Sequence, residues 1–284
     1  MRSIVRRDTG ESYNEFLEGL AKASGIETPT KSDLIKVDKT RKNKASNDDW
    51  QSPSDPDAGI TKMKNGSTHL AHKAEHAVDL DTDAIVAINV YPGHAGDTAT
   101  GPETLEITVG TIEHLHDKTE NAEPQKVKKL AADKGYHSDD VLKTVDDFGI
   151  ESYIASKDVA RNFEGKPAEK KRYQANERRL KTQNGDELFR RRSEKTERSM
   201  AHMYLTGAMR RCWLRGHGNI IKRLMIHAVS FNLGLIMRKE FDCGTPRGLA
   251  ENLSQIIVDF LMSIAGNFGR ITSILNPVTC RCQN

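Results

Sequence analysis

The sequence predicts an α/β protein whose strands form a mixed sheet. Apolar stretches of strand-like composition alternate with stretches of helical spacing, and turn residues separate the two kinds of segment. In chain order we expect strand, strand, helix, strand, helix and strand, at residues 69–80, 84–91, 102–116, 127–132, 138–148 and 150–156. The length of 284 residues allows one large domain or two smaller ones.

Residues 1–67 are expected to form a partly disordered or helical N-terminal segment. SYNEFLEGLAKASGI, residues 12–26, places Phe16 and Leu20 near one side of an amphipathic helix. Residues 31–57 are rich in Lys, Asp, Ser and Pro and poor in apolar side chains. That composition predicts a loop or disorder, because too little apolar surface is available to offset the entropy of ordering.

Residues 68–240 are expected to form the main domain. The turn DTD, residues 81–83, joins the first two strands as a hairpin. Asp97 is a candidate cap for the helix that begins near Pro102. Gly149 is expected to close the second helix, because glycine adopts the left-handed conformation that often ends helices.

A basic insertion, residues 157–192, interrupts this domain with weak periodicity. It interleaves Tyr173 and Phe189 with lysines and arginines, a composition that suits phosphate contacts and base stacking. A helix at 193–206 is expected to follow and to stop at Gly207.

A longer helix is predicted at 218–239, and the remaining residues, 241–284, form a tail with one further helix expected at 252–275. The apolar residues of the longer helix recur at helical spacing, which predicts a stripe that faces the core. The stripe consists of Ile220, Ile221, Leu224, Met225, Ala228, Val229, Leu235 and Ile236.

Charge is distributed unevenly along the chain. Residues 157–223 hold 19 Lys and Arg against 8 Asp and Glu, a net charge of +11, so the rest carries −8 of the total +3. Such asymmetry indicates a surface that binds a polyanion, although a solvated charged face would give the same pattern.

The four cysteines are interpreted as reduced thiols of a cytoplasmic protein, since their spacing fits neither a disulfide framework nor a zinc site. We expect no membrane partner: Met1 is not followed by an apolar run, and the most apolar tail segment is short and contains Asp259.

His69, His72 and His76 do not share one strand face and are not expected to bind a metal. Trp213 is interpreted as a core anchor, with stacking on DNA as the alternative.

Two acids are candidates for chemistry. Asp133 ends an apolar strand, where an ionised carboxylate is costly unless an N–H group, an arginine or a metal ion meets it. Glu197 lies in a helix among arginines. A helix cap and a surface ion-pair set are the ordinary interpretations. One strand-end Asp and one helical Glu also fit a phosphoryl-transfer site in which carboxylates hold two Mg²⁺ ions.

Three segments together resemble DDE transposases of bacterial insertion sequences. LAADKGYHSDDVL resembles the second-aspartate motif of that family, and the segment from Arg190 to Lys239, with Glu197 followed by Arg198, resembles its third-acid region. SPSDPDAGITKMKNGSTHLAHKAEHAVDLDTDAIVA is similar to the region ahead of the early strands. The resemblance runs from Met1 to about Leu249.

The resemblance implies an RNase H-like domain that cuts and joins DNA with two Mg²⁺ ions, in a bacterial cytoplasm near the nucleoid, as a homodimer on DNA. Water would attack a phosphodiester at the element end, and the freed 3′-OH would attack target DNA. Asp133 and Glu197 would be the second and third metal carboxylates, with Glu194 as the nearest rival. The arginines expected to contact DNA are Arg190, Arg191, Arg192, Arg198, Arg210, Arg211 and Arg215.

The chain departs from the family pattern in two ways. The Y-x₂-R-x₃-E-x₆-K signature is not matched, because Ser193 and Tyr204 occupy its Arg and Lys positions. MRSIVRRDTGESY is similar to the tail of the segment that carries the first aspartate, so that residue and the first strand would precede Met1. The chain is then expected to be truncated and inactive.

Asp79, Asp81 and Asp97 are the available substitutes for the first aspartate. Three interpretations stay open at this point: a transposase, a non-catalytic DNA-binding protein derived from one, and a relic without a cellular role.

Overall fold

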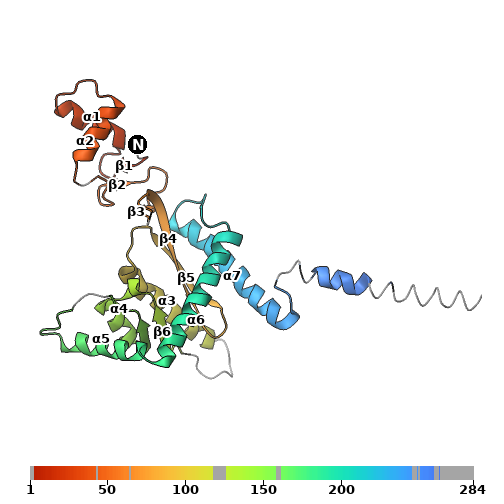
Figure 1. Ribbon diagram of the computed structural model, residues 1–284. Coiled ribbons are helices and arrows are strands. Elements are labelled where there is room, and N and C mark those ends of the chain that lie inside the picture. The colour runs from red at the N-terminus through yellow and green to blue at the C-terminus, as the bar shows by residue number, and fades with distance from the viewer. Residues whose placement is uncertain are drawn as a thin grey trace, which may run out of the picture. The chain divides into compact units, whose positions relative to one another are not determined.

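The computed structural model describes residues 3–42, 44–63, 65–117, 126–157, 161–244, 248, 250–258 and 262 (Figure 1). It divides into two compact units, Met1–Val229 and Ser230–Asn284. Helices and strands of both pairings are present in the first unit, so the predicted α/β class is confirmed. The division into segments at residues 67 and 240 stays a prediction.

The N-terminal elements share a small core. β1 (Val5–Arg6) pairs with β2 (Trp50–Gln51), and α1 (Tyr13–Ala23) and α2 (Lys31–Thr40) pack beside them. The buried members of this core are Ile4, Tyr13, Leu17, Ala21, Leu34 and Trp50.

The predicted first helix is therefore confirmed as α1, but the predicted loop or disorder at 31–57 is wrong over α2 and β2. Thr30 and Asp33 form a capping box that starts α2, and Leu34 and Trp50 supply apolar contacts that composition underrated.

The predicted hairpin supplies two strands of a three-stranded antiparallel sheet. β3 (Gly59–Lys62), β4 (Thr68–Val78) and β5 (Ile85–Pro92) lie in that order. A parallel pair follows, in which β6 (Lys129–Ala132) lies beside β7 (Glu151–Ile154).

The predicted single mixed sheet is corrected in one respect. Among the described residues, β4 pairs with β3 and with β5, and β6 pairs only with β7. No strand pairing in this part of the chain joins β4 to β6, so the two sheets are separate.

Helices connect and cover these sheets. α3 (Asp97–Asp117) contacts β4, β5 and α4 (Asp139–Asp147), while α4 and α5 (Pro167–Leu180) contact β7. The core between them contains Leu105, Val141, Leu142, Val145, Ile150 and Ile154.

Gly149 has φ 69° directly after α4 and its N–H bonds the Asp146 carbonyl, as predicted for a closing glycine. Asp97 is the first residue of α3, five positions before Pro102.

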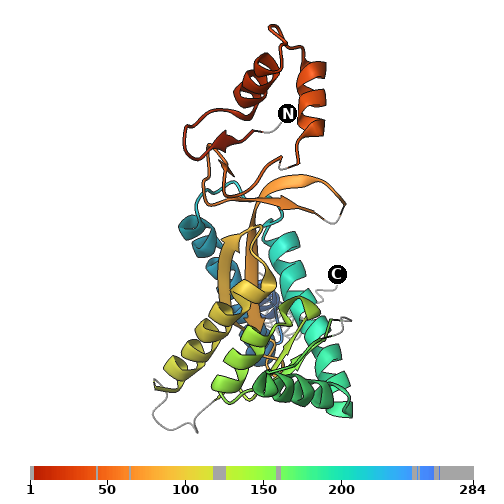
Figure 2. The same cartoon turned by 90° about the vertical axis from the view of Figure 1, so that its left-hand side faces the viewer.

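α6 (Gln183–Ala201) contacts β4, β6 and β7, and thus touches both sheets (Figures 1 and 2). It continues into one π-helical turn, His202–Thr206, which ends at Gly207 as predicted. The predicted start at residue 193 is wrong by ten residues. Thr182 caps the helix by accepting the Gly185 N–H, and the charged first half shows little apolar periodicity.

α7 (His217–Phe241) contains the predicted apolar stripe, but fewer of its residues are buried than predicted. Ile220, Leu224 and Ala228 are buried, but Met225, Val229 and Ile236 are exposed, which corrects the broader stripe. In the described part of the chain, α7 alone is long and apolar enough to cross a membrane, a test that core helices of soluble proteins also meet. Residues 250–258 are helical, and most of the rest of the predicted 252–275 helix lies outside the described residues.

Candidate active site

Asp133 follows β6 directly and presents its carboxylate to solvent, with 65% of the side chain exposed. Its backbone is extended, with φ −68° and ψ 160°, and its side chain makes no capping bond to the 3₁₀ turn Lys134–Tyr136. Ser138 caps α4 instead, accepting the Val141 N–H at 3.2 Å. The carboxylate is thus not used as a helix cap, and its partner is Arg192 Nη2, 3.3 Å from Oδ1.

A charged network supports the loop after Asp133. Asp97 lies so close to Gly135 that a Cβ on that glycine would be 2.1 Å from Asp97 Oδ2. Lys73 Nζ holds Asp97 Oδ1 at 2.6 Å and Glu75 Oε1 at 2.5 Å. Burial raises the pKa of the Tyr136 phenol, and the charges of Glu75, Asp97 and Asp133 raise it further. Of the three substitute acids, Asp97 is therefore the one beside the Asp133 loop.

The two candidate glutamates of α6 differ in their surroundings. Glu194 Oε1 accepts a bond from Arg198 at 3.0 Å and lies 4.0 Å from Lys195 Nζ. Glu197 is exposed and, within the described part of the chain, has no hydrogen bond or ion pair. A carboxylate without an internal partner is the more available of the two for a ligand.

The direction of Glu197 follows from helix geometry. Each α-helical residue is rotated by about 100°, so Glu197, five positions after Arg192, lies about 140° around α6 from it. Arg192 is the residue that meets Asp133. α6 therefore contacts Asp133 through Arg192, and Glu197 projects from a different face of the helix than Arg192 does.

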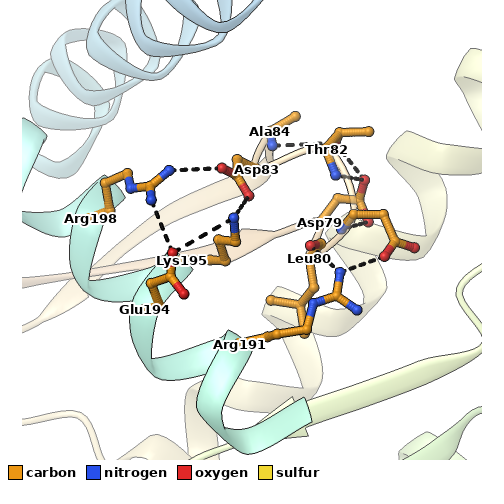
Figure 3. Close-up of polar contacts among 10 residues, drawn as sticks. Asp79, Leu80, Thr82, Asp83, Ala84, Arg191, Glu194, Lys195 and Arg198 are labelled. Atoms are coloured by element: carbon orange, nitrogen blue, oxygen red, sulfur yellow. Dashed lines mark hydrogen bonds and ion pairs between the residues drawn. The ribbon is translucent and has the colours of Figure 1, made fainter. Parts of the chain in front are cut away.

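A second face of α6 forms ion pairs with the turn between β4 and β5 (Figure 3). Arg191 Nη2 bonds the Leu80 carbonyl and lies 2.6 Å from Asp81 Oδ1. Asp83 meets Lys195 Nζ at 2.7 Å and Arg198 Nη1 at 2.9 Å. The substitute acid Asp81 thus lies at this turn, not beside Asp133; Asp79 lies in the same turn and bonds Thr82.

A third contact joins α6 to β4. His76 Nε2 lies 2.6 Å from Ser199 Oγ, and the Ser199 hydroxyl donates to the Thr196 carbonyl at 3.0 Å. Because that hydroxyl proton is already used, His76 is assigned as the donor, with its proton on Nε2. Burial lowers the pKa of His76 to about 4, so the ring is neutral near pH 7.

The arginines predicted to contact DNA fall into two groups. Arg191, Arg192 and Arg198 are engaged in the ion pairs just described. Arg190 and the loop arginines, by contrast, are exposed and have no ion pair in the described part of the chain. These loop residues are Arg210, Arg211 and Arg215. Trp213 lies among them with 90% of its side chain exposed, so its prediction as a core anchor is wrong.

The acids of this region suit a hard divalent cation in type but not in arrangement. Carboxylate oxygens are the donors that Mg²⁺ prefers. Among the described residues, however, no three His, Cys, Asp or Glu side chains lie close enough together to hold an ion. Arg192 pairs with Asp133, and Glu197 lies on a different face of α6 from Arg192. The residues as arranged therefore do not form a metal site.

Sequence reasoning missed Lys73, Glu75, Asp83 and Lys195. Asp83 lies 115 residues from Arg198 along the chain, and no local pattern connects them. The two acids of the DTD turn are adjacent to a strand pattern, but nothing in the sequence indicates that α6 contacts them.

One comparison identifies a family. The transposase DDE domain family matches residues 29–233, which is more than two thirds of the chain. No curated protein and no solved structure matched. The matched range includes Asp133 with its Lys-Gly-Tyr loop, the β4–β5 hairpin and the whole of α6. The chain belongs to the transposase DDE domain family.

Proposed function

We propose that this chain derives from the transposase of an insertion sequence, acting on DNA through Asp133 and Glu197. Transposase function in general follows from the family, whose members bind DNA and generally use a divalent metal ion. The observation that carries the proposal is the family match together with Asp133, a carboxylate 65% exposed on the loop that follows β6.

The finer fold proposal is an RNase H-like domain over residues 68–240, with the basic insertion 157–192 inside it. The order hairpin, α3, β6, α4 and β7, with α6 across both sheets, supports it. Residues 1–67 and 241–284 are proposed as the flanking segments.

The proposed chemistry is DNA strand cleavage followed by strand transfer. A water oxygen attacks a phosphodiester phosphorus, the bond to the 3′ oxygen breaks, and that oxygen leaves as a 3′-OH. The oxygen of this 3′-OH then attacks a phosphodiester phosphorus of target DNA, and the bond from that phosphorus to the target's 3′ oxygen breaks. The proton of the attacking hydroxyl passes to the leaving oxygen, which becomes a new 3′-OH. Asp133 and Glu197 are proposed as metal carboxylates, and Mg²⁺ as the metal. Among the described residues, the acids as arranged do not form a metal site.

The proposed DNA surface is the loop between the π-helical turn and α7. Arg210, Arg211 and Arg215 are exposed, and Trp213 lies among them with 90% of its side chain exposed. Exposed cations can meet phosphates without first breaking an internal pair, and an exposed indole can stack on a base. The remaining proposed contacts are Arg190, Arg191, Arg192 and Arg198.

Fluorescence anisotropy with a labelled duplex tests this surface. R210A/R211A/R215A should weaken binding and reduce the slope of log affinity against log salt by up to about 2.7, since each phosphate contact contributes about 0.9. K31A/K36A/K39A is the matched control, because it removes three exposed cations from α2. Equal losses in both variants would point to net charge rather than to this loop.

We further propose that these residues alone do not support strand transfer. Two-metal phosphoryl transfer depends on a full set of carboxylates, and the described acids do not assemble one. The test incubates the chain with Mg²⁺ and DNA carrying the inverted-repeat end. Cleavage that disappears in D133N would contradict the proposed inactivity while supporting the transposase chemistry.

A non-catalytic DNA-binding protein of transposase descent is the second candidate, favoured by the absence of a three-acid cluster among the described residues. Both candidates bind DNA in a salt-dependent way. Cleavage that requires both Mg²⁺ and Asp133 separates them. A bacterial cytoplasmic, nucleoid-associated location and a homodimer on DNA belong to the transposase proposal.

A further inference from the structure

The turn between β4 and β5 presents acidic side chains from a fixed backbone. Asp79 accepts bonds from the Thr82 hydroxyl and from the Asp81 and Thr82 N–H groups, which closes the turn. Asp83 has φ 66°, a left-handed conformation that Asp and Asn tolerate better than most residues. The result is an acidic turn, defined here as residues 79–84. Asp83 of this turn reaches Lys195 of α6 (Figure 3), and Asp81 reaches Arg191.

α6 meets this turn with a stripe of three cations. Arg191, Lys195 and Arg198 are spaced by four and three residues, so they lie along one face of the helix. Arg191 pairs with Asp81, while Lys195 and Arg198 both pair with Asp83. These three residues are called the cation stripe.

These contacts fix the rotation of α6 about its own axis. With the cation stripe on the acidic turn, Arg192 faces Asp133 and Ser199 faces His76. Glu197 then lies about 140° from Arg192 around the helix. In this rotation of α6, the described acids do not form a metal site.

We propose that Asp81 and Asp83 are positioning residues that occupy the cation stripe in place of DNA phosphates and hold Glu197 away from Asp133. This inference rests on the proposed function and concerns the regulation of the same site. Carboxylate and phosphate oxygens are equivalent partners for guanidinium and ammonium groups. DNA that binds the stripe must displace the acidic turn, and the displacement frees α6 to change its rotation.

The exposure of the pairs makes this exchange feasible. Asp81 is 83% exposed and Arg198 is 50% exposed, so their ion pairs are screened and individually weak. The Asp83–Lys195 pair is less exposed, at 15% and 20%, and is the firmer part of the contact. A polyanion that engages all three cations and releases counterions can compete with contacts of this strength.

The test compares two double variants of the full chain in anisotropy titrations. The probe is a fluorescein-labelled duplex of about 30 base pairs, roughly three helical turns. D81N/D83N should bind it several-fold more tightly, and its salt slope should steepen by up to about 1.8, because Arg191 and Lys195 lose their Asp partners and each freed cation adds about 0.9. Arg198 keeps its ion pair with Glu194. Asn at position 83 preserves the left-handed backbone, and circular dichroism confirms folding.

D8N/D139N is the matched control. It also removes two negative charges and also releases two arginines, Arg6 and Arg172, from ion pairs away from α6. A gain in D81N/D83N that the control lacks, and that K195A/R198A in the same background removes, supports the inference. No gain, or an equal gain in the control, overturns it.

The proposed function is judged by a separate comparison. Its DNA surface fails if R210A/R211A/R215A binds as well as the unaltered chain. The inference about the acidic turn fails only on the result for D81N/D83N. The two outcomes are read from different variants and cannot be confused.

Discussion

Arg192 Nη2 lies 3.3 Å from Asp133 Oδ1, which ties the helix α6 to the end of β6. The arginine is the more buried partner, with 19% of its side chain exposed against 65% for the aspartate, and its guanidinium lies 5.6 Å from the Phe189 ring. We expect D133N to change the free energy of unfolding by less than about 1 kcal/mol, because an exposed ion pair contributes little. R192A should cost about 1–2 kcal/mol through lost packing.

Urea denaturation at pH 7 measures both values. Which of the two variants loses more stability matters more than the size of either loss. A carboxylate retained for a ligand should be removable without much loss of stability. A larger loss in D133N than in R192A would identify Asp133 as a structural residue and would weaken its proposed catalytic role.

The pH dependence of stability should report His76. Burial holds its pKa at about 4 in the folded state, below 6.5 for the free side chain. Between these values the unfolded chain binds the proton and the folded chain does not, so the His76 contribution is complete above pH 6.5 and is lost as the pH falls toward 4. The full loss is at most about 3.4 kcal/mol.

H76Q separates this contribution from those of the carboxylates, which also destabilise the fold in acid. Gln can still donate to Ser199 but does not titrate. Denaturation midpoints at pH 7.5 and pH 5 should therefore differ less in H76Q than in the unaltered chain. Equal differences would mean that His76 is not held neutral by its surroundings.

The elements that sequence predicted well are those with local signals. The hairpin of β4 and β5 has apolar strands around a DTD turn, and the closing role of Gly149 is visible in its position after a helical pattern. α2 was missed because only Leu34 of its ten residues is buried, so its capping box was the sole local signal. A helix that depends on few core contacts leaves little trace in composition.

The candidate site was predictable only where the motif is contiguous. Asp133 and its loop follow one strand, and the resemblance to the family identified them. The contacts of Asp97 with Gly135 and of Asp83 with Arg198 join residues far apart in the chain. Such pairs depend on how α3 and α6 pack on the strands, which periodicity does not specify.

Asn176 should be among the residues most important for stability. It is 0% exposed, and its side-chain amide bonds both backbone groups of Ile154, accepting the N–H at 2.9 Å and donating to the carbonyl at 2.8 Å. N176A would leave two buried backbone groups unpaired, and we expect a loss of about 2–4 kcal/mol in urea denaturation.

N176D provides the matched comparison because the side chain keeps its size. When ionised it can accept from the Ile154 N–H but repels the carbonyl, and it buries a charge. When protonated it can donate again. The stability of N176D relative to N176A should therefore rise as the pH is lowered from 7 to 5. A difference that does not change with pH would contradict this account.

Gly135 should not tolerate a side chain, because an added Cβ would lie 2.1 Å from Asp97 Oδ2, which Lys73 holds in place. G135A is expected to cost about 1–3 kcal/mol by overpacking. D97A removes the obstructing oxygen, so G135A/D97A should be more stable than the two single losses predict, by at least about 0.5 kcal/mol.

G110A in α3 is the control: its Cβ meets open space, and helix propensity predicts a gain of up to about 1 kcal/mol. Strict additivity of G135A and D97A would mean that the loop after Asp133 does not depend on its contact with Asp97.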